Sequence, residues 1–143
     1  MGYTHYFENK GHKDDQKNFL KVLAEAKKLY ESLPEHSESA GGYSSDDPLK
    51  ICGCDGEGEP EFEVDCICFN GDASVNLDHE GFLVIPEPFN DFCKTARKPY
   101  DLLVCAVLIS MKKHFVNFSY SSDGKPDDWK PAKEFYEKVC GKK

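Results

Sequence analysis

The first residues of the chain alternate between aromatic and polar side chains. This alternation over residues 3–7 predicts an opening β-strand, which Gly11 ends. A different period follows, because apolar residues then recur every three or four positions until Pro34. That spacing predicts an amphipathic helix over residues 15–33, with acidic residues in its first turn.

Glycine, proline and polar residues divide the middle of the chain. Residues 35–48 hold almost no apolar side chains, so we expect a mobile acidic loop there. Residues 63–69 predict a strand that ends at a turn dipeptide, and residues 81–85 predict the strand that returns beside it in a hairpin. Pro86 and Pro88 then interrupt the regular structure.

The last third of the chain predicts a helix, a strand and a second helix. Pro99 fits the first turn of a helix over residues 99–115. This helix is apolar on nearly every side, so we expect it to be buried. Residues 116–121 alternate as a strand, and Asp127 or Asp128 caps the final helix.

The order of these elements predicts an α+β fold. We expect one domain over residues 1–143, in which a mixed or mainly antiparallel sheet packs against a buried central helix, with an N-terminal and a C-terminal helix. A chain of 143 residues with 39% hydrophobic residues is long enough to bury a core. We see no apolar run near the roughly 20 residues of a membrane span and no secretory pattern, so we expect a cytoplasmic protein that does not enter membranes.

The negative charge of the chain is concentrated in one stretch. The net charge is −8, and residues 35–65 alone carry ten acidic side chains against one lysine. A basic face is needed to hold a nucleic-acid backbone, so we expect no direct nucleic-acid binding. The stretch is either a solvated segment that favours solubility or an acidic surface that inhibits a host factor by competing for a basic partner.

The cysteine pattern favours free thiols. Seven cysteines is an odd number, and without a secretory signal it predicts reduced side chains. The pairs Cys52/Cys54 and Cys66/Cys68 leave a four-thiolate zinc site as an alternative to small buried side chains. Cys105 lies within the apolar helix and is predicted to be in the core.

Three cations gather near the start of the predicted helix over residues 99–115. Arg97 is the one arginine among 18 basic residues, and Lys94 and Lys98 flank it. A helix N-terminus offers unpaired N–H groups and partial positive charge, so these cations predict an anion-binding site. The alternative is a structural ion-pair network in which nearby acids, such as Asp91 and Asp101, neutralise the cluster.

Two weaker patterns suggest catalysis. Cys93 lies beside these cations, which would lower its pKa, and His5 or His79 would then be the partner of a thiolate nucleophile. His79 and Glu80 are adjacent and form a candidate acid–base pair.

Several motifs resemble a family of small uncharacterised proteins encoded by phages and bacteria. The shared motifs are MGYTHY at 1–6, FNG at 69–71, HE at 79–80, FCKTARKPYD at 92–101, SSDG at 121–124 and DW at 128–129. The resemblance implies a phage or mobile-element setting and no particular reaction.

In that setting we expect non-enzymatic sequestration of a small anionic, nucleotide-derived ligand, as in a phage counter-defence sponge of host immune signals. The alternatives are a hydrolase or phosphodiesterase acting on the same ligand class, and the acidic interaction protein described above. We predict no cofactor and no metal, and homo-oligomerisation is left open. The candidate ligand-binding residues, which are cations, aromatic rings or hydrogen-bonding groups, are Lys94, Thr95, Arg97, Lys98, Tyr3, His5, Tyr6, Asn70, His79, Glu80, Ser122, Asp123 and Trp129.

Overall fold

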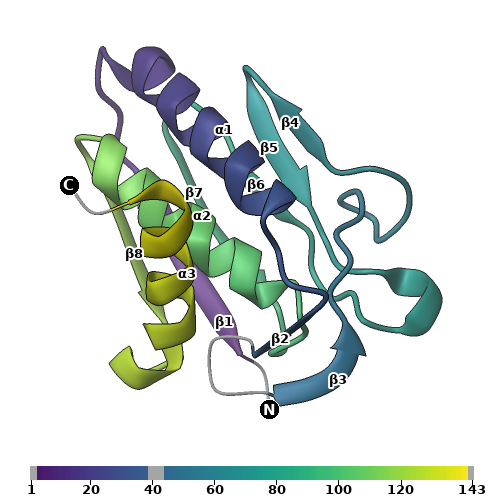
Figure 1. The fold of residues 1–143 in the computed structure, drawn as a ribbon. Coiled ribbons are helices and arrows are strands. Elements are labelled where there is room, and N and C mark those ends of the chain that lie inside the picture. Colours follow the sequence, from purple (N-terminus) through teal and green to yellow (C-terminus); the bar gives the residue numbers. More distant parts are fainter. Residues whose placement is uncertain (1–2, 39–43, 142–143) are drawn as a thin grey trace.

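The computed structural model describes residues 3–38 and 44–141 of the chain, and there it shows an α+β fold (Figure 1). Three helices accompany two antiparallel three-stranded sheets and a separate pair of short strands in this part of the chain. The predicted α+β class is therefore confirmed. In chain order the elements are β1 (Thr4–Asn9), α1 (Asp15–Glu31), β2 (His36–Glu38), β3 (Ser44–Pro48), β4 (Glu61–Glu63), β5 (Cys66–Phe69), β6 (Phe82–Val84), β7 (Phe89–Lys94), α2 (Asp101–His114), β8 (Phe118–Ser122) and α3 (Lys130–Cys140).

The first strand is the middle strand of its sheet. The order of this sheet is β7-β1-β8, and both neighbours run antiparallel to β1. The register places His5 opposite Cys93 on β7 and opposite Ser122 on β8. Alternation along β1 buries His5 and Phe7 and leaves Tyr6 46% exposed. The predicted strand period is therefore confirmed, and it turns His5 toward the helices.

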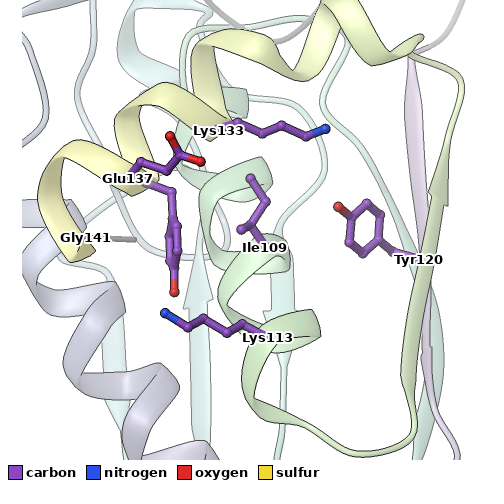
Figure 2. A pocket seen from close by; sticks show the side chains of 7 residues that line it. Ile109, Lys113, Tyr120, Lys133, Glu137 and Gly141 are labelled. Carbon is purple, nitrogen blue, oxygen red and sulfur yellow. The ribbon is translucent and has the colours of Figure 1, made fainter. Parts of the chain in front are cut away.

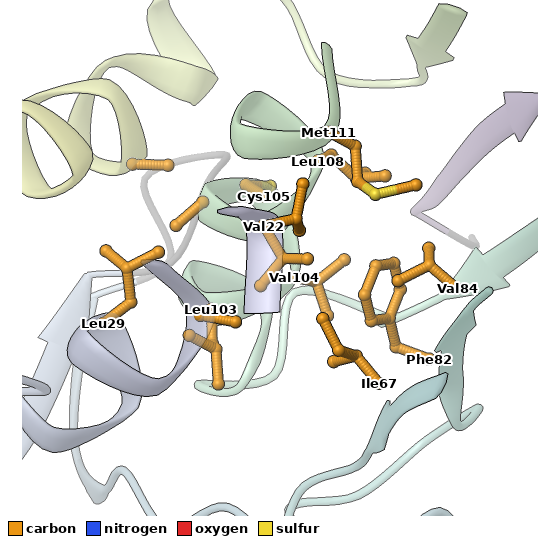
Figure 3. Packing of buried hydrophobic residues seen from close by; sticks show 14 of the residues in the cluster. Val22, Leu29, Ile67, Phe82, Val84, Leu103, Val104, Cys105, Leu108 and Met111 are labelled. Carbon is orange, nitrogen blue, oxygen red and sulfur yellow. The ribbon is translucent and has the colours of Figure 1, made fainter. Parts of the chain in front are cut away.

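The three helices pack against one another as well as against strands. Helix α2 contacts both α1 and α3, and the strands lie behind these helices (Figure 1). This arrangement differs from a single central helix that is covered by one sheet. Figure 3 shows side chains of α2 meeting side chains of α1 and of the β5–β6 hairpin. The labelled members of this cluster are Val22, Leu29, Ile67, Phe82, Val84, Leu103, Val104, Cys105, Leu108 and Met111. None of the described helices is long and apolar enough to cross a bilayer.

Two predictions about extended structure are wrong. Strands β2 and β3 pair within residues 35–48, where we expect a loop, while residues 39–43 lie outside the described residues. Strand β7 forms directly after Pro86 and Pro88, where we expect irregular structure. It is an edge strand with an exposed Asn90-Asp91-Phe92 segment, so it lacks the apolar pattern that marks a buried strand.

The cysteines differ from the prediction of free thiols. A disulfide joins Cys54 to Cys68, whose Cα atoms are 5.6 Å apart. The prediction of reduced thiols is therefore wrong for these two residues. A zinc site with four thiolates is not formed either, because two of the four sulfur atoms are bonded to each other. Cys52 and Cys66 are free.

The burial of α2 leads to a stability prediction. Leu108 on α2 is fully buried, whereas Leu20 on α1 is 48% exposed. We expect Leu108→Ala to lower the free energy of unfolding by about 2–5 kcal/mol, because it removes apolar contacts and leaves a cavity. The control Leu20→Ala should change it by less than about 0.5 kcal/mol. Urea denaturation measures both values, and equal losses would contradict the placement of α2 in the core.

Candidate functional site

A buried polar network surrounds His5. Nε2 of His5 is 2.7 Å from Oδ1 of Asp101, the first residue of α2. Nδ1 of the same ring is 2.8 Å from Oγ of Ser122 at the end of β8. Thr95, in the turn before α2, donates its hydroxyl to Oδ1 of Asp101 over 2.6 Å. The network therefore connects the middle strand, the edge strand β8 and the start of α2.

The chemistry of the partners assigns a direction to these hydrogen bonds. A carboxylate only accepts, so Nε2 of His5 must carry the proton that Asp101 receives. In a neutral imidazole Nδ1 is then an acceptor, and Ser122 must donate its hydroxyl proton to it. The backbone N–H of Gly124 donates to Oγ of Ser122 over 2.9 Å, which uses an acceptor site of that oxygen.

Cys105 completes the network from α2. Its Sγ is 3.6 Å from Oδ2 of Asp101 and 3.5 Å from Nε2 of His5. These three buried side chains are of metal-ligating types, and one ligand atom of each lies within 4.8 Å of the others. Burial, and then the charge of Asp101, raises the pKa of the Cys105 thiol well above its usual value. The thiol therefore stays protonated and donates to Asp101, so this network satisfies its polar atoms by its own hydrogen bonds.

Tyr3 lies beside this network, under Arg97. The Arg97 guanidinium is 3.9 Å from the centroid of the Tyr3 ring, and that ring meets His5 edge-on at 5.1 Å. The Tyr3 hydroxyl is buried and has no hydrogen-bond partner among the residues that the structure describes. A Cβ at position 124 would overlap this oxygen, which explains why Gly124 is needed there. Burial and the negative charge of Asp101 raise the pKa of Tyr3, although Arg97 acts in the opposite direction.

The three predicted cations precede α2 and do not lie in it. Lys94 is the last residue of β7, and Arg97 lies in a turn where both it and Ala96 adopt positive φ angles of 60° and 53°. The Lys98 ammonium donates to the backbone carbonyl of Asn76 over 3.1 Å. The carboxylate of Asp101 points inward to His5, so this acid does not neutralise the cations as the alternative interpretation expects.

Three other predicted residues have structural partners. The Asn70 amide donates to the carbonyls of Cys54 and His79, and its oxygen accepts from the His79 N–H. Nδ1 of the exposed His79 is 2.7 Å from the carbonyl oxygen of Lys94. Glu80 Oε1 accepts from the N–H of Lys94. Asn70 thus joins the loops around Cys54 and His79, while His79 and Glu80 bond to the backbone of Lys94 in β7. The predicted His79–Glu80 acid–base pair is therefore engaged with backbone.

The prediction that the pKa of Cys93 is lowered, which would make it a thiolate nucleophile, is wrong. Burial, followed by the charge of Glu80, raises the pKa of the Cys93 thiol. The thiol contacts the Glu80 carbonyl at 3.4 Å. His5 lies opposite Cys93 in the strand register, but the thiol in contact with the His5 ring belongs to Cys105.

The remaining candidates are distributed over both faces of the sheet. Tyr6 is on the outer face, where its ring meets Phe92, so it lies away from His5. Asp123 is exposed, and its carboxylate accepts from the backbone N–H of Thr4. Trp129 is buried and meets the His5 ring edge-on.

A pocket of about 480 Å³ opens between α2, α3 and β8 (Figure 2). Trp129 lies between the pocket and the network, because its ring meets His5 on the network side and stacks on Tyr120 of the pocket wall, with centroids 4.9 Å apart. In Figure 2 the ammonium groups of Lys113 and Lys133 lie on opposite sides of Ile109. The lining residues are Ile109, Lys113, Tyr120, Lys133, Tyr136, Glu137 and Gly141.

None of the candidate residues predicted from the sequence lines this pocket. The one signal is the four-residue spacing within two pairs, Ile109 with Lys113 and Lys133 with Glu137, which places each pair on one face of its helix. The two pairs belong to different helices, α2 and α3, and the spacing within each pair does not predict that these helices pack with the pairs facing each other.

Glu25 on α1 anchors one wall of the pocket. Its Oε1 accepts hydrogen bonds from the hydroxyls of Tyr136, at 2.6 Å, and Ser110, at 2.7 Å. Nε2 of His114 is 3.1 Å from the same oxygen. Burial alone would raise the pKa of Glu25, but the hydrogen bonds from Tyr136 and Ser110, together with the nearby His114 ring, outweigh it, and the pKa is lowered.

The lowered pKa of Glu25 leads to a pH prediction. A carboxyl with a depressed pKa in the folded state contributes stability above its unfolded pKa and loses it as the pH falls. We expect the free energy of unfolding to decrease as the pH falls below 4.5, the ordinary pKa of a glutamate side chain. The decrease should be smaller in Glu25→Gln, which has no carboxyl to protonate. Urea denaturation across this pH range measures the difference, and parallel curves for the two proteins would contradict the prediction.

Comparisons with family models, curated proteins and solved structures give no match to this chain. The resemblance to the phage and bacterial family therefore stays a prediction.

Proposed function

We propose that the protein binds a small anionic, nucleotide-derived ligand in the pocket between α2, α3 and β8. The observation that carries the proposal is that the ammonium groups of Lys113 and Lys133 border one open pocket that also has an apolar and aromatic lining (Figure 2). A volume of about 480 Å³ lies within the usual range for small-molecule sites, about 300–1,000 Å³. In the phage setting that the resemblance implies, the protein would sequester such a ligand from the host.

The lining residues suit a ligand that has a phosphate group and a base or sugar. Each lysine offers three donors and a full positive charge to phosphate oxygens. Ile109 and the Tyr120 ring supply apolar surface for a base or sugar. Burial raises the pKa of Tyr120, so its phenol stays protonated and can donate a hydrogen bond. Glu137 leaves the lining with a net charge of +1 and adds an acceptor for a hydroxyl or amino group.

The distribution of charge is compatible with an anion at this position. The acidic stretch over residues 35–65 includes β3 and β4, which lie across the helices from α3 and β8 (Figure 1). Salt screens charges over about 8 Å at physiological ionic strength, so distant acids oppose binding only weakly.

The alternative functions have less support. The described lining of the pocket contains no histidine, cysteine or serine, so the lining residues offer no nucleophile of these types for a hydrolase at this position. Inhibition of a host factor through the acidic stretch stays a prediction, because the side chains of residues 36–47 lie outside the described part.

Lysine variants test the location of the ligand. We expect Lys113→Ala and Lys133→Ala each to weaken binding by about tenfold or more, since each removes a charge-assisted contact. Lys130→Ala is the matched control, an exposed lysine of α3 outside the lining. Isothermal titration with ADP, a cyclic dinucleotide and pyrophosphate measures the affinities.

One result would contradict the proposed function, and another would contradict the proposed location of the site. Absence of binding by every probe, with no small molecule co-purifying in a mass-spectrometric search, would contradict the proposed function. Loss of binding in Arg97→Ala with unchanged affinity in the lysine variants would move the site to the cations before α2.

Heating the complex and analysing the released ligand then separates sequestration, which returns the ligand intact, from hydrolysis, which returns it cleaved.

A further inference from the structure

The network around His5 has the order of a nucleophile, a base and an orienting carboxylate. Oγ of Ser122 lies 2.8 Å from Nδ1 of His5, and Oδ1 of Asp101 lies 2.7 Å from Nε2. With a neutral ring that is protonated on Nε2, Ser122 donates to His5 and His5 donates to Asp101. In serine hydrolases a base takes the hydroxyl proton while a carboxylate holds the other ring nitrogen, and such sites are recognised by these roles rather than by sequence position. We propose that Ser122 is the nucleophile of an acyl-transfer site, with His5 as its base and Asp101 as the residue that positions His5.

The fold holds these three groups on rigid elements. The strand register fixes Ser122 opposite His5, and the first turn of α2 presents Asp101. The Thr95 hydroxyl holds the Asp101 carboxylate from a second direction. Trp129 and Tyr3 pack edge-on against the His5 ring and restrict its rotation. The direction of proton transfer from Ser122 to His5 is therefore set before any substrate binds.

The nucleophile is more accessible than its base. His5 and Asp101 are fully buried, whereas Ser122 is partly exposed at the end of the edge strand β8. Ser122 is thus the member of the three that a substrate can reach from solvent, while the buried carboxylate stabilises the imidazolium that forms when Oγ loses its proton. The site lies on the other side of Trp129 from the pocket, so this inference does not depend on the proposed function.

The Tyr3 hydroxyl gives a second, independent observation. It is buried, lacks a hydrogen-bond partner in the described part of the chain and lies against Gly124, whose N–H bonds to Oγ of Ser122. Negative charge developing on a carbonyl oxygen beside Ser122 would give this phenol the acceptor that it lacks. The nearby Arg97 guanidinium favours negative charge at the same place.

The substrate class that fits these groups is a carboxylic ester. Oγ of Ser122 attacks the carbonyl carbon, its proton passes to Nδ1 of His5, and the oxygen that becomes negative accepts from Tyr3. The bond from carbon to the leaving oxygen then breaks, and that oxygen takes the proton from His5. Water repeats the sequence on the acyl-serine and releases the acid.

The test measures the reactivity of Ser122 in the wild-type protein. A fluorophosphonate probe forms a bond from Oγ to phosphorus, fluoride leaves, and the hydroxyl proton passes through His5 to water. Peptide mass spectrometry compares the rate at Ser122 with the rates at Ser119 and Ser121, which are exposed on the same strand. We expect modification of Ser122 to be about 100-fold faster, the lower range of general-base catalysis. Equal rates, or no adduct at Ser122, would overturn the proposal.

Two variants separate this role from a structural one. Asp101→Asn presents an amide that can donate to Nε2, which reverses the ring tautomer, and the rate at Ser122 should fall by about 100-fold or more. A purely structural Asp101 would lower the melting temperature and leave the preference for Ser122 over Ser121 unchanged in the folded fraction.

Tyr3→Phe removes only a hydroxyl that has no partner among the described residues, so the variant should fold as well as the wild type. Its rate at Ser122 should fall by about 100-fold, as for loss of an oxyanion donor. Tyr6→Phe on the outer face is the matched control and should leave the rate unchanged. Equal rates in the two variants would overturn the assignment of Tyr3 as the donor to the oxyanion.

Discussion

The buried contact between His5 and Asp101 is the interaction on which the rest of this structure depends. It joins the middle strand of the first sheet to the first turn of α2, across 96 positions of sequence. A histidine and a carboxylate without partners would be costly in a core, and breaking such a buried pair costs about 3–5 kcal/mol. Here Ser122, Thr95 and Cys105 supply the remaining hydrogen bonds. The pair therefore fixes how the N-terminal strand, β8 and α2 meet.

This contact helps to position both candidate sites, the one at Ser122 and the pocket between α2, α3 and β8. On one side the His5 ring orients Ser122. On the other side Trp129 packs against the same ring and stacks on Tyr120, which forms a wall of the pocket. One aromatic side chain thus connects the polar network with the pocket, and it is buried in this role rather than exposed for stacking on a ligand.

The fold was predictable wherever the local pattern was strong. The three helices, the β5–β6 hairpin and the alternation of β1 follow from the hydrophobic pattern together with turn, proline and cap residues. Strand β7 was not predictable, because a strand at the edge of its sheet, paired with β1 on one side, needs little apolar patterning and here follows two prolines. The Cys54–Cys68 disulfide was missed for a related reason, since the pairing of cysteines depends on which strands the fold brings together.

The candidate site was predictable in its residues but not in their roles. His5 and Ser122 are among the predicted polar candidates, whereas Asp101 enters only in the alternative, as one of the acids that would neutralise the cations. In the structure it is the partner of His5. These contacts span most of the chain, and only the strand register brings them together. The pocket was missed for the same reason, because Lys113 and Lys133 belong to different helices.

The most direct test of the His5–Asp101 contact is to determine which ring nitrogen of His5 carries the proton. A long-range ¹H–¹⁵N correlation spectrum of the labelled protein, recorded at about pH 8 and therefore above the ordinary histidine pKa, reports which nitrogen carries the proton. We expect a proton on Nε2, donated to Asp101, and an unprotonated Nδ1 that accepts from Ser122. A ring protonated on Nδ1 alone, or on both nitrogens, would contradict it.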